Sequence, residues 1–530
     1  MKKMLGVMLD CSRNAVMKPE KVKEYAQIIR KMGYNTLMLY TEDTYEIESE
    51  PYFGHLRGRY TKQELKDVDS YCNSIGIELI PCVQTLAHLK QMFEWRKIYS
   101  DIQDCDDILL IGDKKTYALI EEMIKTLSEC FTSRKIHIGM DEAYRVGSGK
   151  YETINGRRDR FDIINEHLHK VCEITDKYGL EPMIWSDMFV KLAAGENGTS
   201  DQYADVDVAK IQERAALPEN ISLVYWDYYH DEYDHYDKML KRNKLFGRKV
   251  YFGGGAWTWG GLAPFNKLSI KRTAPAIDAC IDNDAADIFF TVWGDDGAEC
   301  SKFTILPTLM FAAEKLKGNT DMDSIKRKFK EIVEVDYDSF MLLDEFDSPG
   351  GKHFDDGSAS KYLLYNDPFM GMFDSYCLEG DAEHYKKLAE KLANVSADGD
   401  LGLLFKNYEK LARVLSTKAT LGIRTRKAYL ENDKESLKTI IEDYGKTIES
   451  LKEYYEAFQN RWYSESKPHG FEVQDIRVGG LIQRVSSCKE RLEQYVSGAI
   501  SEIPELHEPV LEGANGYLWR KCVTANVISH

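Results

Sequence analysis

The sequence lacks long apolar runs, paired cysteine spacings and any targeting segment. No stretch has the roughly 20 consecutive apolar residues that a membrane-spanning helix needs. The N-terminus carries two lysines but only a short apolar run before Asp10, so no signal-peptide core is visible. The 11 cysteines form no CxxC pair, which favours reduced thiols over a disulfide framework or a zinc site. We therefore expect a cytoplasmic protein.

Basic clusters and phosphate-binding loops are missing as well. Lysine and arginine total 70 against 87 aspartate and glutamate residues, which gives a net charge of −17. Such a surface repels phosphate backbones and anionic lipids, so we expect neither nucleic acid nor membrane as a partner. No GxGxxG follows the first predicted strand, and Gly253-Gly254-Gly255 lacks the Walker lysine. No phosphate cradle is therefore expected.

Short apolar strands alternate with helical patterns over roughly the first 320 residues. Pro19 and Gly33 bound the first helix, and Thr61 with Glu64 predicts a capping box at the start of the second. The alternation predicts an α/β fold, either a (β/α)8 TIM barrel or a doubly wound open sheet, and the missing phosphate loop favours the barrel. The eight predicted strands are residues 4–9, 36–40, 77–82, a short run at 136, 182–185, 221–226, 249–252 and 287–292.

The pattern changes after about residue 336, where strand signals nearly disappear. Leu401, Leu404, Tyr408 and Leu411 recur every three or four positions, as one face of a helix requires. We predict a barrel over residues 1–335 and an all-α C-terminal domain over residues 336–530, which offers a face for a homodimer. The predicted long helices are residues 382–393, 401–421, 423–432, 434–462 and 479–496.

Polar, acidic and aromatic residues follow all eight predicted strands. In a barrel these positions face one pocket at the carboxyl ends of the strands. Aromatic faces with scattered carboxylates and one arginine suit a sugar, whose ring stacks while its hydroxyls are bridged. The residues are Arg13, Glu42-Asp43, His88, Asp141-Glu142, Trp185-Ser186-Asp187, Trp226-Asp227-Tyr228-Tyr229, Trp257 and Trp293-Gly294-Asp295-Asp296.

Metal ligands are sparse at these positions. Only His88 and His137 lie near strand ends as nitrogen ligands, and the sequence has no HxH or HExxH spacing there. Tryptophans in the same pocket leave little room for a polar metal cage. We expect no metal and no cofactor.

The adjacent carboxylates Asp141 and Glu142 limit the mechanism. A usual retaining glycosidase holds two carboxyls ~5 Å apart across the scissile bond, which neighbouring residues do poorly. They can act side by side if Glu142 protonates the leaving oxygen while Asp141 orients a 2-acetamido group that serves as internal nucleophile. The alternatives are a conventional retaining glycosidase with Asp187, Asp227 or Asp295 as nucleophile, and a catalytically silent sugar-binding barrel.

The hexapeptide His137-Ile138-Gly139-Met140-Asp141-Glu142 resembles the H-x-G-x-D-E signature of glycoside hydrolase family 20, the β-N-acetylhexosaminidases. The resemblance covers roughly residues 1–335 and is closest to a short branch without the family's N-terminal α/β domain. It implies an exo-enzyme that removes terminal β-linked GlcNAc or GalNAc from an oligosaccharide or glycoconjugate. The implied mechanism is retaining and substrate-assisted, through an oxazolinium ion, with Asp141 orienting the acetamido group and Glu142 as general acid/base.

The resemblance also implies roles for residues on other strands. Arg13 matches the arginine that binds the sugar 3- and 4-hydroxyls, and His88 matches a supporting histidine. Glu42 is the match for the acidic residue after strand two, with Asp43 as the alternative. Asp295 stands where the family has the Glu of W-x-E, which binds the 4- or 6-hydroxyl. Three tryptophans match the walls that box the acetamido methyl and the ring: Trp185, Trp257 and Trp293.

The family tyrosine that contacts the acetamido oxygen has more than one match. Tyr228 and Tyr229 follow strand six directly, and Tyr236 is also at a suitable spacing. We select Tyr229 because it shares a strand face with Tyr225 and Asp227. Asp227 is expected to bind substrate.

Overall fold

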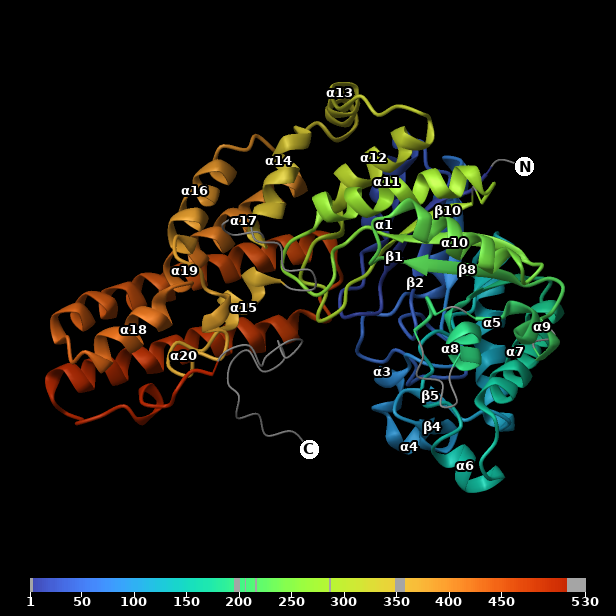
Figure 1. Ribbon diagram of the computed structural model, residues 1–530, viewed down its shortest axis with the longest axis horizontal. Helices are drawn as coiled ribbons and strands as arrows, with labels where there is room; N and C mark the ends of the chain where they lie inside the picture. Colours follow the sequence, from blue (N-terminus) through green and yellow to red (C-terminus); the bar gives the residue numbers. More distant parts are fainter. Residues whose placement is uncertain are drawn as a thin grey trace. The chain divides into compact units, whose positions relative to one another are not determined.

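Eight parallel strands close into a barrel in the computed structural model (Figure 1), in the order β1-β10-β9-β8-β7-β6-β3-β2. The structure describes residues 3–194, 201–204, 206–214, 217–285, 287–347 and 358–511. Because β1 pairs with both β2 and β10, the predicted (β/α)8 barrel is confirmed and the open sheet is excluded. The strands are β1 (Leu5–Asp10), β2 (Thr36–Tyr40), β3 (Glu78–Cys82), β6 (Lys135–His137), β7 (Glu181–Trp185), β8 (Ser222–Asp227), β9 (Lys249–Gly255) and β10 (Ile288–Val292).

The strands read as unbroken apolar runs because both of their faces are buried. All five residues of β2 and all five of β10 are buried. Side chains from several strands, among them Met38, Ile80, Trp185 and Phe289, pack together in one core cluster. The barrel is therefore a filled core, and chemistry is left to its ends.

Helices lie outside the strands, as α1, α5, α7 and α10 show in Figure 1. The capping box of α2 is confirmed: the Thr61 hydroxyl accepts the Glu64 N–H (3.1 Å) and the Glu64 carboxylate accepts the Thr61 N–H (2.8 Å). The barrel helices are α1 (Pro19–Met32), α2 (Lys62–Ser74), α5 (Lys114–Cys130), α7 (Arg160–Lys177), α8 (Asp187–Ala194), α9 (Val208–Arg214), α10 (Tyr233–Lys244), α11 (Asn266–Asp282) and α12 (Leu306–Leu316). Short unpredicted elements interrupt the loops: α3 (Lys90–Phe93), α4 (Arg96–Tyr99), β4 (Gln103–Cys105), β5 (Ile108–Leu109) and α6 (Lys150–Asn155).

The chain divides into two compact units, each made of several sequence segments. The first unit comprises residues 1–257, 267–293 and 308–325, and the second comprises residues 258–266, 294–307 and 326–530. The connections that follow β9 and β10 thus belong to the second unit. Their partners explain this, since the Leu262 carbonyl accepts the Tyr408 hydroxyl (2.9 Å) and Ser301 donates to Glu465 (2.8 Å).

The second unit is helical in the residues described, as predicted. Helix α17 packs on α16 and α19, and α19 packs on α20. Helix α20 begins at Phe471, after Gly470 in the left-handed conformation, and not at the predicted residue 479. Gly479 and Gly480 lie inside the helix, with open space around them. The helices are α13 (Met322–Val333), α14 (Tyr337–Met341), α15 (Ala359–Tyr365), α16 (Asp381–Ala393), α17 (Gly399–Lys418), α18 (Leu421–Leu430), α19 (Lys434–Glu465) and α20 (Phe471–Ser497).

The described residues contain neither a membrane-spanning helix nor a disulfide bond. No helix there is long and apolar enough to cross a bilayer. The ten cysteines within the described ranges are all unpaired, in line with the prediction of reduced thiols.

Candidate functional site

The turn that follows β6 has an unusual backbone. Gly139 has a φ of +73°, and a Cβ there would lie 2.1 Å from the Gln84 side-chain oxygen and 2.8 Å from the Val83 carbonyl. Met140 (φ 71°) and Glu142 (φ 51°) also occupy the left-handed region, which costs free energy in residues with a Cβ. The glycine of the hexapeptide is therefore required by the close approach of Gln84, and the strained turn fixes the two carboxylates.

Asp141 has a polar partner at each of its two carboxylate oxygens. The Gln84 amide donates to Oδ1 (2.6 Å), and its oxygen accepts the Met140 N–H (3.0 Å). His88 Nε2 lies 3.3 Å from Oδ2. Burial by itself raises the pKa of Asp141, but His88 and the Gln84 amide outweigh it and hold that pKa below its usual range. Asp141 is therefore an ionised acceptor in a fixed orientation.

Asp141 and five other side chains form a closed ring of contacts, which we call the contact ring. Arg13 donates to Glu42 (2.7 Å) and lies 3.4 Å from His88 Nδ1. The Tyr40 hydroxyl donates to Glu42 (3.1 Å) and accepts from Gln84 (2.9 Å). The ring thus joins the ends of β1, β2, β3 and β6. Its members in order are Glu42, Arg13, His88, Asp141, Gln84 and Tyr40.

His88 supplies positive charge beside both carboxylates. Burial by itself lowers the pKa of His88, but the charge of Asp141 and its contact with the ring outweigh burial and raise that pKa to about 9. Its Nε2 also lies 3.8 Å from Glu142 Oε2, and its backbone N–H donates to Asp107 (3.1 Å). By contrast, burial lowers the pKa of His137 to about 3, so this core histidine stays neutral.

Glu142 is partly open to solvent, with 39% of its side chain exposed. Burial and then the charge of Asp141 raise the pKa of Glu142. Tyr144 donates to its Oε1 (3.0 Å), and Lys191 donates to the Tyr144 hydroxyl (2.9 Å). The carboxylate of Asp187 accepts both Lys191 (3.0 Å) and the Glu142 N–H (3.3 Å). One buried ion pair therefore positions both the backbone and the side chain of Glu142.

The three tryptophans predicted to line the sugar pocket differ in burial and in their contacts. Trp185 is only 1% exposed and packs in the barrel core, with its ring 6.3 Å from that of Trp293. Trp293 is half-buried and meets Tyr40 of the contact ring edge-on at 4.7 Å. Trp257 packs beneath the Arg272 guanidinium at 5.3 Å. Trp293 therefore lies beside the contact ring, and Trp185 lies beneath it as part of the core.

The two tyrosines that directly follow β8, Tyr228 and the selected Tyr229, differ in burial. Tyr228 is buried, and its hydroxyl is within hydrogen-bonding reach of Thr291 and Trp293. Burial raises the pKa of Tyr228, and the charge of Asp141 adds to this rise. Tyr229 is 46% exposed, and its ring packs edge-on to Trp257.

Asp227 and Asp295 lie in different surroundings from the contact ring. Both Asp227 oxygens accept protein donors, including the Tyr225 hydroxyl (2.8 Å) and the Tyr229 N–H (3.0 Å). This carboxylate holds its own loop, so its predicted contact with substrate gains no support from the geometry. Asp295 belongs to the second unit, where its carbonyl accepts the Gly260 N–H (3.3 Å), and its contact with sugar stays a prediction.

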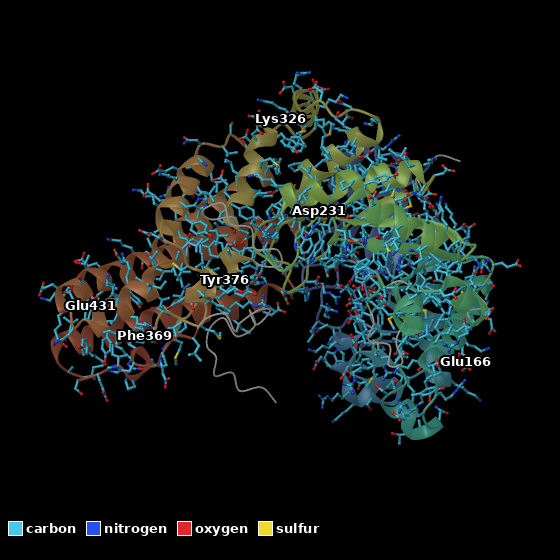
Figure 2. The ribbon with its side chains drawn as sticks, viewed as in Figure 1. Glu166, Asp231, Lys326, Phe369, Tyr376 and Glu431 are labelled. Carbon is cyan, nitrogen blue, oxygen red and sulfur yellow. The ribbon has the colours of Figure 1, made fainter. Side chains whose placement is uncertain are left out.

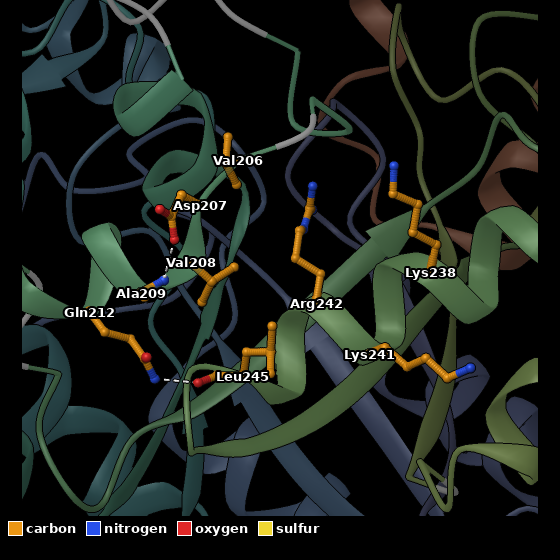
Figure 3. Close-up of a pocket in the computed structure, with 9 residues that line it drawn as sticks. All are labelled: Val206, Asp207, Val208, Ala209, Gln212, Lys238, Lys241, Arg242 and Leu245. Carbon is orange, nitrogen blue, oxygen red and sulfur yellow. Dashed lines mark hydrogen bonds between the residues drawn. The ribbon is translucent and has the colours of Figure 1, made fainter.

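A separate cavity of about 530 Å³ lies between α9 and α10 (Figure 3). Lys238, Lys241 and Arg242 give it a basic lining, and Gln212 donates to the Leu245 carbonyl at its edge. None of the residues predicted for the sugar site lines it. It is therefore distinct from the strand-end site.

Matches to known families agree with the motif and with the helical unit. Residues 4–242 match the family described as glycosyl hydrolase family 20, catalytic domain. Residues 338–517 match the family described as Glycoside Hydrolase 20C C-terminal domain. The chain belongs to glycoside hydrolase family 20. The catalytic match includes Asp141 and Glu142, so this family 20 member is a glycoside hydrolase.

Individual relatives of this family 20 chain are distant. Hexosaminidase D from Bos taurus is 24% identical over 281 residues, which cover 50% of this chain and 74% of the bovine protein. Hexosaminidase D from Homo sapiens is 23% identical over 238 residues, or 43% of this chain and 46% of the human protein. A solved GH20 exo-β-N-acetylglucosaminidase from Vibrio harveyi has 15% identity and a TM-score of 0.48, covering 64% of this chain and 58% of that one. The chain thus spans less than half of the human relative.

Four residues of this family 20 site were not predicted, among them Tyr40, which is the last residue of β2. Gln84 lies two positions past the end of β3, so the strand-end rule that selected His88 also applied to it. Lys191 is four residues after Asp187 on α8, a spacing typical of an ion pair on one helix face. Tyr144 lies in a loop, where sequence spacing carries no geometric information.

Proposed function

We propose that the chain is an exo-acting β-N-acetylhexosaminidase that hydrolyses terminal β-linked GlcNAc or GalNAc from an oligosaccharide or glycoconjugate. The observation that carries this proposal is the pair Asp141 and Glu142, whose pKa values move in opposite directions. The lowered pKa of Asp141 favours the ionised form that accepts a hydrogen bond, and the raised pKa of Glu142 favours the protonated form that donates one. Carboxyl groups with diverging pKa values are the signature of an acid and its partner.

The proposed reaction is retaining and substrate-assisted. The acetamido oxygen attacks the anomeric carbon while the bond to the leaving oxygen breaks, and Glu142 gives its proton to that oxygen. Asp141 accepts the acetamido N–H and stabilises the oxazolinium charge. A water that loses its proton to Glu142 then opens the oxazolinium ring, which restores the β configuration. Tyr228 is our candidate donor to the acetamido oxygen, and Arg13 our candidate for the sugar hydroxyls.

The surroundings of two other carboxylates also support an internal nucleophile. Asp187 is paired with Lys191 and bound to the Glu142 N–H. Asp227 accepts donors from its own strand and loop. Both carboxylates are also buried, whereas a nucleophile must reach the anomeric carbon of the substrate. Mass spectrometry after incubation with a 2-fluoro sugar distinguishes the cases, because a protein adduct would support the conventional retaining mechanism.

The deciding experiment compares p-nitrophenyl substrates that differ only at C2. We expect turnover of the β-GlcNAc or β-GalNAc glycoside and at most trace turnover of the β-glucoside, because the glucoside has no internal nucleophile. A thiazoline mimic of the cyclised intermediate should inhibit competitively. Equal turnover of the GlcNAc and glucose substrates would refute the acetamido mechanism, and no turnover of any sugar would favour a silent sugar-binding barrel.

A further inference from the structure

Two histidines that the strand-end argument did not consider converge on Asp227. His230 lies in the loop between β8 and α10, next to Asp231, which is labelled in Figure 2, and His235 lies in the first turn of α10. His230 Nδ1 is 3.0 Å from Asp227 Oδ2 and 3.1 Å from Oδ1. His235 Nε2 is 3.0 Å from Asp227 Oδ2. Each ring thus points one nitrogen at the same carboxylate.

The spacing of these atoms is close to that of a metal site. All three ligand atoms lie within 4.8 Å of one another. A tetrahedral zinc ion with bonds of about 2.0–2.1 Å separates neighbouring ligand atoms by about 3.4 Å. The two contacts of 3.0 Å between Asp227 and the imidazoles need to lengthen only slightly to admit an ion between them.

The surroundings hold the ligands and leave a way in. The two imidazole rings are stacked, with centroids 3.5 Å apart, and Tyr203 packs edge-on to both, at 4.6 Å from His230 and 5.3 Å from His235. The His230 side chain is 35% exposed and that of His235 is 19% exposed, while Asp227 is buried. A buried carboxylate with two partly exposed imidazoles is open to solvent on one side, where an ion can enter.

The local charge favours a cation. The Asp227 carboxylate is buried, and a buried negative charge requires a positive partner. The Arg272 guanidinium donates to the Tyr228 carbonyl (2.8 Å) and packs on Trp257. The buried carboxylate therefore favours a cation beside the two imidazoles.

We propose that Asp227, His230 and His235 form a binding site for a divalent transition metal, and that zinc is the ion their imidazole and carboxylate ligands favour. Each coordinating nitrogen offers its lone pair while the proton of its ring resides on the other nitrogen. The two parallel rings splay apart so that their lone pairs converge on the ion. Because Tyr228 follows Asp227 directly, the ion ties the loop that leads into α10 to the end of β8.

The test is zinc binding by the full-length chain after EDTA treatment and dialysis into metal-free buffer. Isothermal titration with zinc chloride should give one equivalent per chain, and zinc should raise the melting temperature. His230→Gln and His235→Gln each should weaken binding by about tenfold or more, and the double variant should bind none at this site. Glutamine still donates a hydrogen bond to Asp227, so these variants keep the apo contacts.

The matched control is His55→Gln, an exposed histidine of the same unit that lies outside the cluster. It should bind zinc as the wild type does. A cobalt-loaded wild type should show the visible absorption of a low-symmetry site, and H235Q should lose it. Absence of binding in the wild type, or equal binding by wild type and double variant, would overturn the proposal. Melting of each metal-free variant checks its fold independently of activity.

Discussion

Asp141 and Glu142 are sequence neighbours with opposite electrostatic surroundings. Asp141 faces the His88 imidazole and the Gln84 amide, which both stabilise its charge. Glu142 is partly buried and faces the charge of Asp141, and both effects raise its pKa and favour its protonated form. The pH dependence of the reaction follows from this difference.

We expect Tyr144→Phe to move the alkaline limb of the pH profile to higher pH. The acid must be protonated, so kcat/KM falls as pH rises through the raised pKa of Glu142. The Tyr144 hydroxyl donates to the ionised carboxylate and lowers that pKa, so its removal raises it further. Tyr178→Phe, which removes a hydrogen bond to Glu121, should leave the limb unmoved. A limb that shifts to lower pH in Y144F would contradict the assignment of Glu142.

Substitution of the two carboxylates should give different substrate dependences. Glu142→Gln should lower kcat by about 100-fold or more on alkyl aglycones, and far less on p-nitrophenyl aglycones, which leave without protonation. Asp141→Asn should damage turnover of both kinds of substrate, because it acts on the acetamido group. Steady-state kinetics on the two aglycones measures this, and a mild effect of D141N would refute its role.

Gln84→Leu tests the positioning of Asp141. The amide donates to Asp141 and accepts the Met140 N–H, so its loss frees the carboxylate to shift. We expect kcat to fall by about 100-fold, the usual cost of a small misplacement. Gln63→Leu, which breaks a surface hydrogen bond to Asp67 on α2, is the control. An unchanged kcat in Q84L would show that Asp141 is oriented without Gln84.

At the scale of elements, we expect the turn after β6 to be the one where an added side chain lowers stability most. Gly139→Ala places a methyl group 2.1 Å from Gln84, in addition to the cost of about 1–2 kcal/mol for a Cβ at positive φ. Gly112→Ala carries the same backbone cost, with φ +87° and open space around its Cβ. Thermal melting should therefore show a larger loss for G139A than for G112A. Equal losses would mean that Gln84 moves away freely.

Elements with strong local signals were predictable, and those set by tertiary contacts were not. The strand at residues 36–40 and the capping box at Thr61 follow from apolar runs and cap chemistry. The hairpin of β4 and β5 and the early start of α20 depend on neighbours that no local pattern reports. The sequence also could not predict which of Tyr228 and Tyr229 is buried. Both residues follow the end of β8, where the alternation of strand faces no longer applies.

At the scale of the whole molecule, the two units are interleaved along the chain. Residues 258–266 and 294–307 connect barrel strands and helices but belong to the second unit. Within that unit, Glu299 pairs with Lys361 and Arg477, and all three lie far apart in sequence. A chain cut at residue 335 would therefore lack the residues that contact segments 258–266 and 294–307.

We expect a chain that ends at residue 335 to be inactive and less stable than the full chain. Its two segments would lose Tyr408, Glu465 and other partners, and Glu299 would be left as an unpaired carboxylate. Circular dichroism melting and hydrolysis of the p-nitrophenyl substrate check this. Adding residues 336–530 in trans serves as the rescue control. Full activity of the short chain alone would show that the barrel needs no support.

The contact ring has a consequence for tolerance to substitution. When any one of the six side chains is lost, the other five stay connected as an open chain, and the cost is that of the contacts which the lost member made. A second defect elsewhere in the loop cuts the chain and releases a fragment. The double variant Tyr40→Phe with His88→Asn should therefore lose more activity than the two single variants combined. Substitutions at these six positions are thus expected to depend on one another during evolution.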